Sequence, residues 1–213
     1  MRHIMVMNAK GGAGKSTVAT NIAAYYAKEG KKVALADYDQ QHSSLGWLAR
    51  RPANRPTIAG IDAAKEGLKH LSRAMDVCVM DAPARTVGPE LTSLVNHADT
   101  ILIPVLPSPI DMDATSRFVD MLKATNRVQT KKTTVAVLAN RVRDNTKVAD
   151  ELDEYMQKLK VPYVSWLREA QNYVRAYSRG LGIHELPEYL AWPDWQQWEQ
   201  LIDYLESKRS QPS

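Results

Sequence analysis

The stretch that decides the fold is Asn8-Ala9-Lys10-Gly11-Gly12-Ala13-Gly14-Lys15-Ser16-Thr17, a glycine-rich loop that closes on a lysine and two hydroxyl residues. An apolar run over His3–Met7 precedes this loop, and a helical pattern of apolar residues over Ser16–Glu29 follows it. A glycine-rich loop between a buried strand and an amphipathic helix is typical of phosphate-binding sites. A glycine-rich turn without a ligand is the alternative interpretation.

Each residue type in the loop has a physical role in binding phosphate. Glycines allow the backbone to wrap closely around phosphate oxygens, and the helix start presents free N–H groups and a positive dipole end. Lys15 supplies a point charge, and the Ser16 hydroxyl is a candidate ligand of Mg²⁺. The candidate nucleotide-binding residues in the loop are Gly11, Gly12, Ala13, Gly14, Lys15, Ser16 and Thr17.

Apolar runs of strand length recur along the chain, with helical segments between them. The runs are nearly continuous rather than alternating, which is typical of strands that are buried on both faces of a parallel sheet. We therefore predict an α/β fold in three layers, a mostly parallel twisted sheet with helices on both faces. The predicted strands are His3–Met7, Val33–Ala36, Val77–Met80, Thr100–Val105, Thr133–Ala139 and, more weakly, Val161–Ser165.

Helical spacing of apolar residues also predicts helices over Met112–Lys123 and Val148–Leu159. Asp111 follows a Pro-Ser-Pro turn and is the expected N-cap of the first of these helices. Near the C-terminus, an apolar stripe at helical spacing is expected to pack against the core of the protein. This stripe consists of Trp195, Trp198, Leu201, Ile202 and Leu205.

The composition is that of an ordinary globular protein. The chain has 213 residues, of which 44% are hydrophobic and 24% are charged, so we predict a single domain over residues 1–213. The longest apolar stretch contains three prolines and is too short to cross a bilayer, and the N-terminus lacks a signal sequence, so a cytoplasmic protein is expected. Cys78 is the only cysteine, which excludes an intrachain disulfide and favours a small buried side chain.

Two further strands end in acidic residues. Val33–Ala36 runs into Asp37-Tyr38-Asp39, and Val77–Met80 ends at Asp81. Ligands of open α/β sheets bind at the carboxyl ends of the strands, so these carboxylates are expected beside the phosphate loop. One carboxylate can hold Mg²⁺-bound water while another orients an attacking water molecule. The alternative for Asp37 and for Asp39 is that the side chain caps a turn.

The strand over Thr133–Ala139 ends at Asn140. The side-chain amide of asparagine offers both a donor and an acceptor, which suits recognition of a base edge. The alternative is that Asn140 caps a turn.

The motif Lys-Gly-Gly-x-Gly-Lys-Ser, which begins at Lys10, resembles the deviant Walker A motif of the ParA/MinD family of ATPases. The Asp-x-Asp pair from Asp37, the Walker B strand ending at Asp81 and the strand ending at Asn140 are similar to other motifs of that family. The resemblance extends along essentially the whole chain and implies a P-loop NTPase of the deviant Walker A type. The chain looks like a short, ParF-like member of the family, a type that lacks an additional N-terminal DNA-binding domain.

Two segments are similar to the carboxysome-positioning (McdA-like) ATPases within that group, namely Gln41–Pro52 and Leu106–Asp111. Gln40 departs from the family, which often has proline at this position, so that loop lacks the rigidity that a proline ring would give it. The loop over Ala82–Gly88 is, by resemblance, the switch that senses the γ-phosphate.

The resemblance also implies a role for each residue of the site. Lys10 would act in trans on the phosphates of the partner subunit, and Asp39 would position the attacking water. The implied catalytic residues are therefore Lys10, Lys15 and Asp39, and the implied magnesium residues are Ser16, Asp37 and Asp81. Asn140 would read the adenine base.

The family's cycle implies ATP and Mg²⁺ as cofactors, a homodimer in the ATP-bound state, and slow intrinsic hydrolysis. The dimer would bind nucleoid DNA without sequence preference, and an adaptor on a carboxysome, plasmid or chromosome would stimulate hydrolysis. The net charge is +4, and the basic excess lies largely within residues 117–185. We predict DNA contacts from Arg168, Arg175 and Arg179, because non-specific binding depends on cations that neutralise phosphates. Solvated surface arginines without a ligand are the alternative.

Two other functions are compatible with these motifs. A MinD-like, membrane-associated ATPase would need a basic amphipathic helix, but acidic residues surround the C-terminal apolar stripe, so membrane binding is not expected. A metabolic enzyme that uses ATP on the same fold is the second alternative, because a phosphate loop does not define the acceptor.

Overall fold

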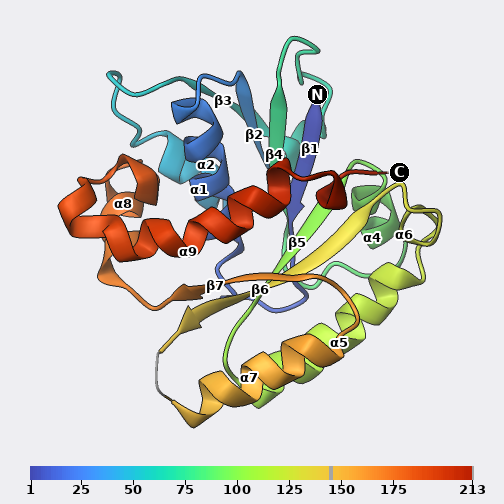
Figure 1. Cartoon of the computed structure of the whole chain (residues 1–213). Helices are drawn as coiled ribbons and strands as arrows, with labels where there is room; N and C mark the ends of the chain where they lie inside the picture. Colours follow the sequence, from blue (N-terminus) through green and yellow to red (C-terminus); the bar gives the residue numbers. More distant parts are fainter. Residues whose placement is uncertain (144–145, 213) are drawn as a thin grey trace.

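The computed structural model describes residues 1–143 and 146–212. A seven-stranded parallel sheet runs through the molecule, and helices cover both of its faces (Figure 1). The strands are β1 (Arg2–Val6), β2 (Val33–Asp37), β3 (Ile58–Asp62), β4 (Val77–Asp81), β5 (Thr100–Val105), β6 (Thr134–Val142) and β7 (Tyr163–Arg168). This arrangement confirms the predicted three-layer α/β fold.

One or more helices follow each strand along the chain. They are α1 (Lys15–Lys28), α2 (Ser43–Leu48), α3 (Ala63–Glu66), α4 (Gly88–Val95), α5 (Pro109–Lys123), α6 (Asn126–Gln129), α7 (Lys147–Lys158), α8 (Gln171–Ser178) and α9 (Glu188–Glu206). Two short 3-10 helices, η1 (Ile183–Glu185) and η2 (Lys208–Ser210), flank α9. Among the described residues, none of these helices combines the length and the apolarity that crossing a bilayer requires.

The strand order is β3-β2-β4-β1-β5-β6-β7, so β1 lies in the interior of the sheet between β4 and β5. Strands β2, β3 and β4 lie on one side of β1 in the sheet, and the later strands β5, β6 and β7 lie on its other side. A crevice forms at the carboxyl edge of an open sheet where the strand order reverses in this way, and ligands bind there. The loop after β1 therefore lies at the point of the sheet where a ligand is expected.

Each face of the sheet has its own hydrophobic core. One core contains Trp47 of α2 and Trp198 of α9 together with apolar residues of α1, and the other contains Phe118 of α5 with residues of α4 and α7. The buried members of the C-terminal stripe are Trp198, Leu201, Ile202 and Leu205, and Trp195 packs against them, which confirms that the stripe belongs to the core. Cys78 is buried, as predicted.

Two predictions about element boundaries need correction. Asp111 is not the N-cap of α5, because this helix begins at Pro109 after Ser108. The proline ring fixes a helical φ at the first position of the helix, so the helix starts earlier than predicted. Strand β3 was not predicted, because Ile58–Asp62 is short and has a glycine in its interior.

Candidate nucleotide site

The phosphate loop connects β1 to α1 and depends on glycines with left-handed backbone conformations. Gly12 has φ = 80° and Gly14 has φ = 88°, which residues with a Cβ rarely adopt. Gly14 is also needed for space, because a Cβ at this position would lie 2.2 Å from Nδ2 of Asn140. Gly14 is the N-cap of α1 and offers no side-chain cap, so the first N–H groups of the helix suit an anionic ligand.

Two asparagines hold the phosphate loop in place. Nδ2 of Asn140 donates a hydrogen bond of 2.8 Å to the carbonyl oxygen of Ala13. Oδ1 of Asn8 accepts a hydrogen bond of 3.0 Å from the N–H of Lys10, while its Nδ2 donates to the carbonyl oxygen of Pro104 at 2.7 Å. Asn8 therefore ties the loop to β5, a role that the sequence analysis missed.

The two lysines of the loop lie in different environments. Lys15 is buried, and its Nζ donates a hydrogen bond of 3.3 Å to the carbonyl oxygen of Lys10. Burial lowers the pKa of Lys15, while the negative charges of Asp81 and Asp39 act in the opposite direction. Lys10 is partly exposed at the other end of the glycines. The loop thus has one cation inside the site and a second at its rim.

Asp81 at the end of β4 is a fully buried carboxyl group. Its Oδ2 accepts a hydrogen bond of 2.6 Å from the Ser44 hydroxyl, while its Oδ1 is buried without a hydrogen-bond partner. Burial raises the pKa of Asp81 to about 6, against the opposing effects of Ser44, Ser16 and Lys15. A buried oxygen without a partner, beside the Ser16 hydroxyl, suits a magnesium site in which phosphate and water supply the other ligands.

A magnesium site of this kind does not need an all-protein cage. Within the described part of the chain, no group of three or more histidine, cysteine, aspartate or glutamate side chains could enclose a metal ion. Mg²⁺ usually keeps several water ligands and binds proteins through one or two side chains together with phosphate oxygens. The donors Ser16 and Asp81 match this pattern.

The first aspartate of the Asp-x-Asp pair supports the start of α2. The Asp37 carboxylate accepts hydrogen bonds from the N–H groups of Asp39, Ser44 and Leu45, at 3.0, 2.9 and 3.1 Å. Burial raises the pKa of Asp37, and these three hydrogen bonds oppose that shift. The side chain therefore holds the loop that carries Asp39 and Ser44, and its role at a magnesium ion stays a prediction.

Asp39 is more accessible than Asp37. Its Oδ1 accepts a hydrogen bond of 2.9 Å from the N–H of Gln41, so this aspartate also caps its own turn. It is partly exposed beside Lys15, in a position that a water molecule can reach. The following residue, Gln40, keeps a backbone N–H, which the family's proline would lack.

The loop over Ala82–Gly88, for which a switch role stays a prediction, contacts the phosphate loop through the backbone. The N–H of Arg85 donates a hydrogen bond of 3.0 Å to the carbonyl oxygen of Ala9, and Arg85 has φ = 61°. The two loops are therefore joined by a direct hydrogen bond.

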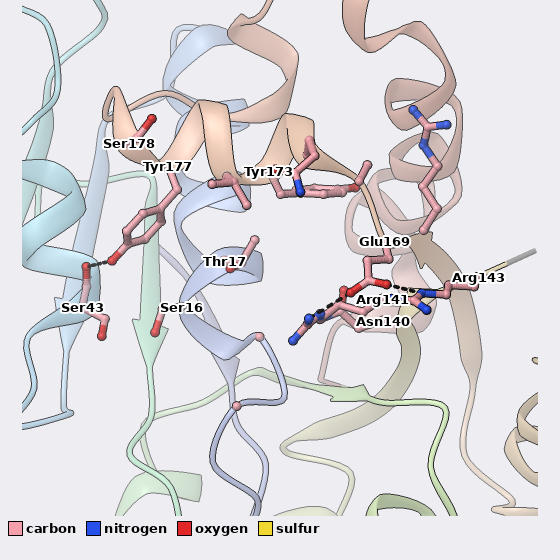
Figure 2. Close-up of a pocket in the computed structure, with 16 residues that line it drawn as sticks. Ser16, Thr17, Ser43, Asn140, Arg141, Arg143, Glu169, Tyr173, Tyr177 and Ser178 are labelled. Carbon is pink, nitrogen blue, oxygen red and sulfur yellow. Dashed lines mark hydrogen bonds and ion pairs between the residues drawn. The ribbon is translucent and has the colours of Figure 1, made fainter. Parts of the chain in front are cut away.

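A cavity of about 830 Å³ opens beside the phosphate loop (Figure 2). Gly12, Gly14, Ser16 and Thr17 line one side, and the segment from β7 into α8 lines the other. Its volume lies within the ~300–1,000 Å³ typical of pockets for small ligands. The cavity therefore has the size and the position needed for the base and sugar of a nucleotide whose phosphates lie on the loop.

Polar side chains shape the walls of this cavity. Glu169 pairs with Arg141 and Arg143, and the Tyr177 hydroxyl donates a hydrogen bond of 2.7 Å to the carbonyl oxygen of Ser43 (Figure 2). Asn140 also lines the cavity, but its Nδ2 is bonded to the phosphate loop. Its role in reading adenine stays a prediction.

The three arginines predicted to contact DNA lie along one segment, from the end of β7 to the end of α8. Arg168 lines the cavity, and its Nε lies 2.6 Å from Oδ1 of the fully buried Asp194. Arg175 donates a hydrogen bond of 3.4 Å to Oδ1 of Asn172 within α8, and Arg179 is exposed at the end of that helix. The contact of these arginines with DNA stays a prediction. The ion pair with Asp194 gives Arg168 a structural role as well.

The fold and the site together define a P-loop nucleotide-binding protein. A family model described as the CobQ/CobB/MinD/ParA nucleotide binding domain matches residues 4–183, and the chain belongs to that family. This result confirms the resemblance to the ParA/MinD proteins that the motifs indicate.

Individual relatives and solved structures agree with this assignment. The chain is 28% identical over 189 residues to maintenance of carboxysome distribution protein A from Halothiobacillus neapolitanus, covering 86% of this chain and 87% of the relative. It is 33% identical over 117 residues to the protein of that name from Gloeobacter kilaueensis, covering 52% of each.

Two solved structures share the fold. The apo McdA structure from Cyanothece is similar with a TM-score of 0.77 and 19% identity, over 96% of this chain and 99% of that one. MinD from Aquifex aeolicus gives a TM-score of 0.71 with 21% identity, over 95% of this chain and 97% of that one.

Proposed function

We propose that this protein is a ParA-type ATPase that dimerises with ATP, binds nucleoid DNA and positions a cargo, for which a carboxysome is our first choice. The observation that carries the proposal is the pair of lysines, Lys10 and Lys15, that flank the glycines of the phosphate loop. The similarity to carboxysome distribution proteins supports the choice of cargo. We place the protein in the cytoplasm, associated with the nucleoid.

The residues of the site have complementary roles in ATP hydrolysis under this proposal. Lys15 and the N–H groups at the start of α1 bind the phosphates, and Ser16 and Asp81 hold Mg²⁺, which supplies charge neutralisation when bound. Asp39 accepts a hydrogen bond from the attacking water and orients it. Because phosphoryl transfer depends mainly on positioning and electrostatic stabilisation, these fixed groups suit ATP hydrolysis.

Lys10 links nucleotide binding to assembly. Its position at the rim of the loop leaves it accessible to a second subunit, whose triphosphate it would contact in a dimer. ATP would then favour the dimer through contacts that the monomer lacks. DNA binding follows from dimerisation, because two copies of a basic surface neutralise more backbone phosphates than one. An adaptor on the cargo would stimulate hydrolysis and so release the dimer from DNA.

The experiment that tests this proposal compares two lysine variants by sedimentation with ATP and Mg²⁺. We expect Lys15→Ala to lose nucleotide binding, and Lys10→Ala to bind ATP with at most a few-fold loss but to remain monomeric. Lys31→Ala, which changes an exposed lysine far from the loop in sequence, serves as the matched control and should dimerise normally. Dimerisation of Lys10→Ala at the wild-type nucleotide and protein concentrations would contradict the proposal.

A further inference from the structure

A second cavity lies at the other end of the sheet, where β6 and β7 begin. It has a volume of about 570 Å³, whereas the phosphate loop lies at the carboxyl ends of the strands. Four separate segments line it, namely the end of α5, the loop before β6, the loop before β7 and the C-terminal residues around η2. Figure 1 shows the C-terminus close to α6 on this side of the molecule.

The charges around this cavity are all of one sign. Lys131, Lys160, Lys208 and Arg209 line it, and none of the described lining residues is acidic. These four cations form no ion pair with any residue in the ranges 1–143 and 146–212. By contrast, the arginines around the first cavity are paired, such as Arg168 with Asp194. The second cavity therefore has a positive charge that the described chain does not neutralise.

Some polar groups of the cavity form hydrogen bonds within the protein, and at least one does not. Nζ of Lys123 donates a hydrogen bond of 2.9 Å to the carbonyl oxygen of Leu159. The Tyr204 side chain lies among the lining residues, and Tyr204 is only 6% exposed. Its hydroxyl lies near Thr134 and Arg209 but forms no hydrogen bond of good geometry. A buried hydroxyl without a well-formed bond is costly unless a ligand completes it.

The C-terminal wall of the cavity is held rigidly. The Arg2 guanidinium donates hydrogen bonds to the carbonyl oxygen and the hydroxyl of Ser210, at 2.6 and 2.8 Å. The Thr134 hydroxyl donates to the same carbonyl oxygen at 2.8 Å. Lys208 and Arg209 immediately precede Ser210, so their backbone is fixed at the cavity before any ligand arrives. Such preorganisation reduces the entropy lost on binding.

We propose that this cavity is a second anion-binding site, which takes a small ligand carrying two or more phosphate groups. The hollow shape and its volume suit a small molecule, whereas the four unpaired cations suit several negative charges close together. The Tyr204 hydroxyl donates a hydrogen bond to the ligand. The site is separate from the phosphate loop, so a ligand there is bound in addition to a nucleotide.

The test is a calorimetric titration of inorganic tripolyphosphate into the full chain at fixed free Mg²⁺, with ADP present in excess so that the phosphate loop is filled. We expect one further molecule of tripolyphosphate to bind. Lys160→Glu combined with Lys208→Glu should weaken this binding by at least about tenfold, because four units of charge change beside the ligand. The matched control is Lys31→Glu combined with Lys69→Glu, which makes the same change at exposed lysines outside the cavity and should leave the affinity unchanged.

A gentler variant separates binding from folding. Tyr204→Phe removes only a hydroxyl that lacks a well-formed bond, so we expect a melting temperature no lower than that of the wild type and a loss of affinity of about threefold or more. The proposal is overturned if wild-type protein does not bind tripolyphosphate, or if the cavity variants bind as tightly as the wild type. It is equally overturned if short duplex DNA, and not tripolyphosphate, is the ligand that the Lys160→Glu/Lys208→Glu variant loses. None of these outcomes depends on ATP hydrolysis or dimerisation, so each leaves the proposed function to be judged separately.

Discussion

Burial of Asp81 disfavours the ionised form of its carboxyl group. Its side chain is 0% exposed. One carboxyl oxygen accepts a hydrogen bond from the Ser44 hydroxyl, and the other oxygen has no hydrogen-bond partner. Burial raises the pKa to about 6, which means that ionisation of this carboxyl group destabilises the folded protein when no cation is bound. A divalent cation would reverse that effect, so the residue is placed for ligand binding at a cost in stability.

Asp81→Asn should therefore stabilise the protein without nucleotide while weakening Mg²⁺-dependent nucleotide binding. Because the folded-state pKa is raised, the wild type loses stability as pH rises from about 4 to about 6, and the penalty is complete above that range. We expect the variant to be about 1–3 kcal/mol more stable at pH 8, with the difference vanishing towards pH 4. Urea unfolding of both proteins across this pH range measures the effect, and a pH-independent difference would contradict it.

Asp39 is the residue to which we assign orientation of the attacking water. Asp39→Ala should keep ATP binding, favour the dimer and lower the hydrolysis rate by about a hundredfold or more, since a positioning base contributes roughly this factor. Steady-state phosphate release, alongside sedimentation with ATP, measures both parts. Asp120→Ala, at an exposed position of α5, is the control. Hydrolysis by Asp39→Ala at the wild-type rate would show that another group positions the water.

At the scale of elements, a buried ion pair joins the end of α2 to η1. The Arg51 guanidinium makes two hydrogen bonds to the Glu185 carboxylate, at 2.9 and 2.8 Å, and the side chains are only 5% and 1% exposed. The Glu185 carboxylate also accepts a hydrogen bond of 2.8 Å from the N–H of Gly182. The pair thus fixes α2, which carries Ser44 to the site, against the segment before α9.

Glu185→Ala should destabilise the protein by about 3–5 kcal/mol, because it leaves a buried guanidinium without its partner. Urea unfolding at neutral pH measures this change. Glu66→Ala removes an exposed partner of His70 and should change the free energy of unfolding by less than about 0.5 kcal/mol. A loss below about 1 kcal/mol in Glu185→Ala would mean that water or another group replaces the carboxylate.

Elements with strong local signals could be predicted from the sequence. The continuous apolar runs identify six of the strands, and the glycine-rich loop identifies the start of α1, because burial on both faces and left-handed backbone positions leave a direct trace in residue type. Strand β3 leaves no such trace, since the exposed Gly60 interrupts its short apolar run. The roles of Asn8 and Ser44 depend on long-range hydrogen bonds to Pro104 and Asp81, which no local pattern encodes.

At the scale of the whole molecule, the chain presents two regions suited to anions at opposite ends of one sheet. The first is the nucleotide site at the carboxyl ends of the strands, and the second is the basic cavity around Lys160 and Lys208. The first is completed by a second subunit under the proposed function, since Lys10 acts across the dimer. The DNA surface of that dimer is predicted at Arg175 and Arg179, which are exposed at α8.

The most direct measurement is binding of the purified protein to unrelated duplex DNA with ATP and Mg²⁺, with ADP, and without nucleotide, over a range of salt concentrations. The proposed function predicts that the protein binds DNA with ATP and Mg²⁺ but not with ADP or without nucleotide. This binding should weaken steeply as the salt concentration rises, because contacts with DNA phosphates release counterions. Arg175→Glu combined with Arg179→Glu should lose this binding but keep ATP-dependent dimerisation. Absence of binding in every nucleotide state, or equal binding in all of them, would contradict an ATP-controlled attachment to the nucleoid.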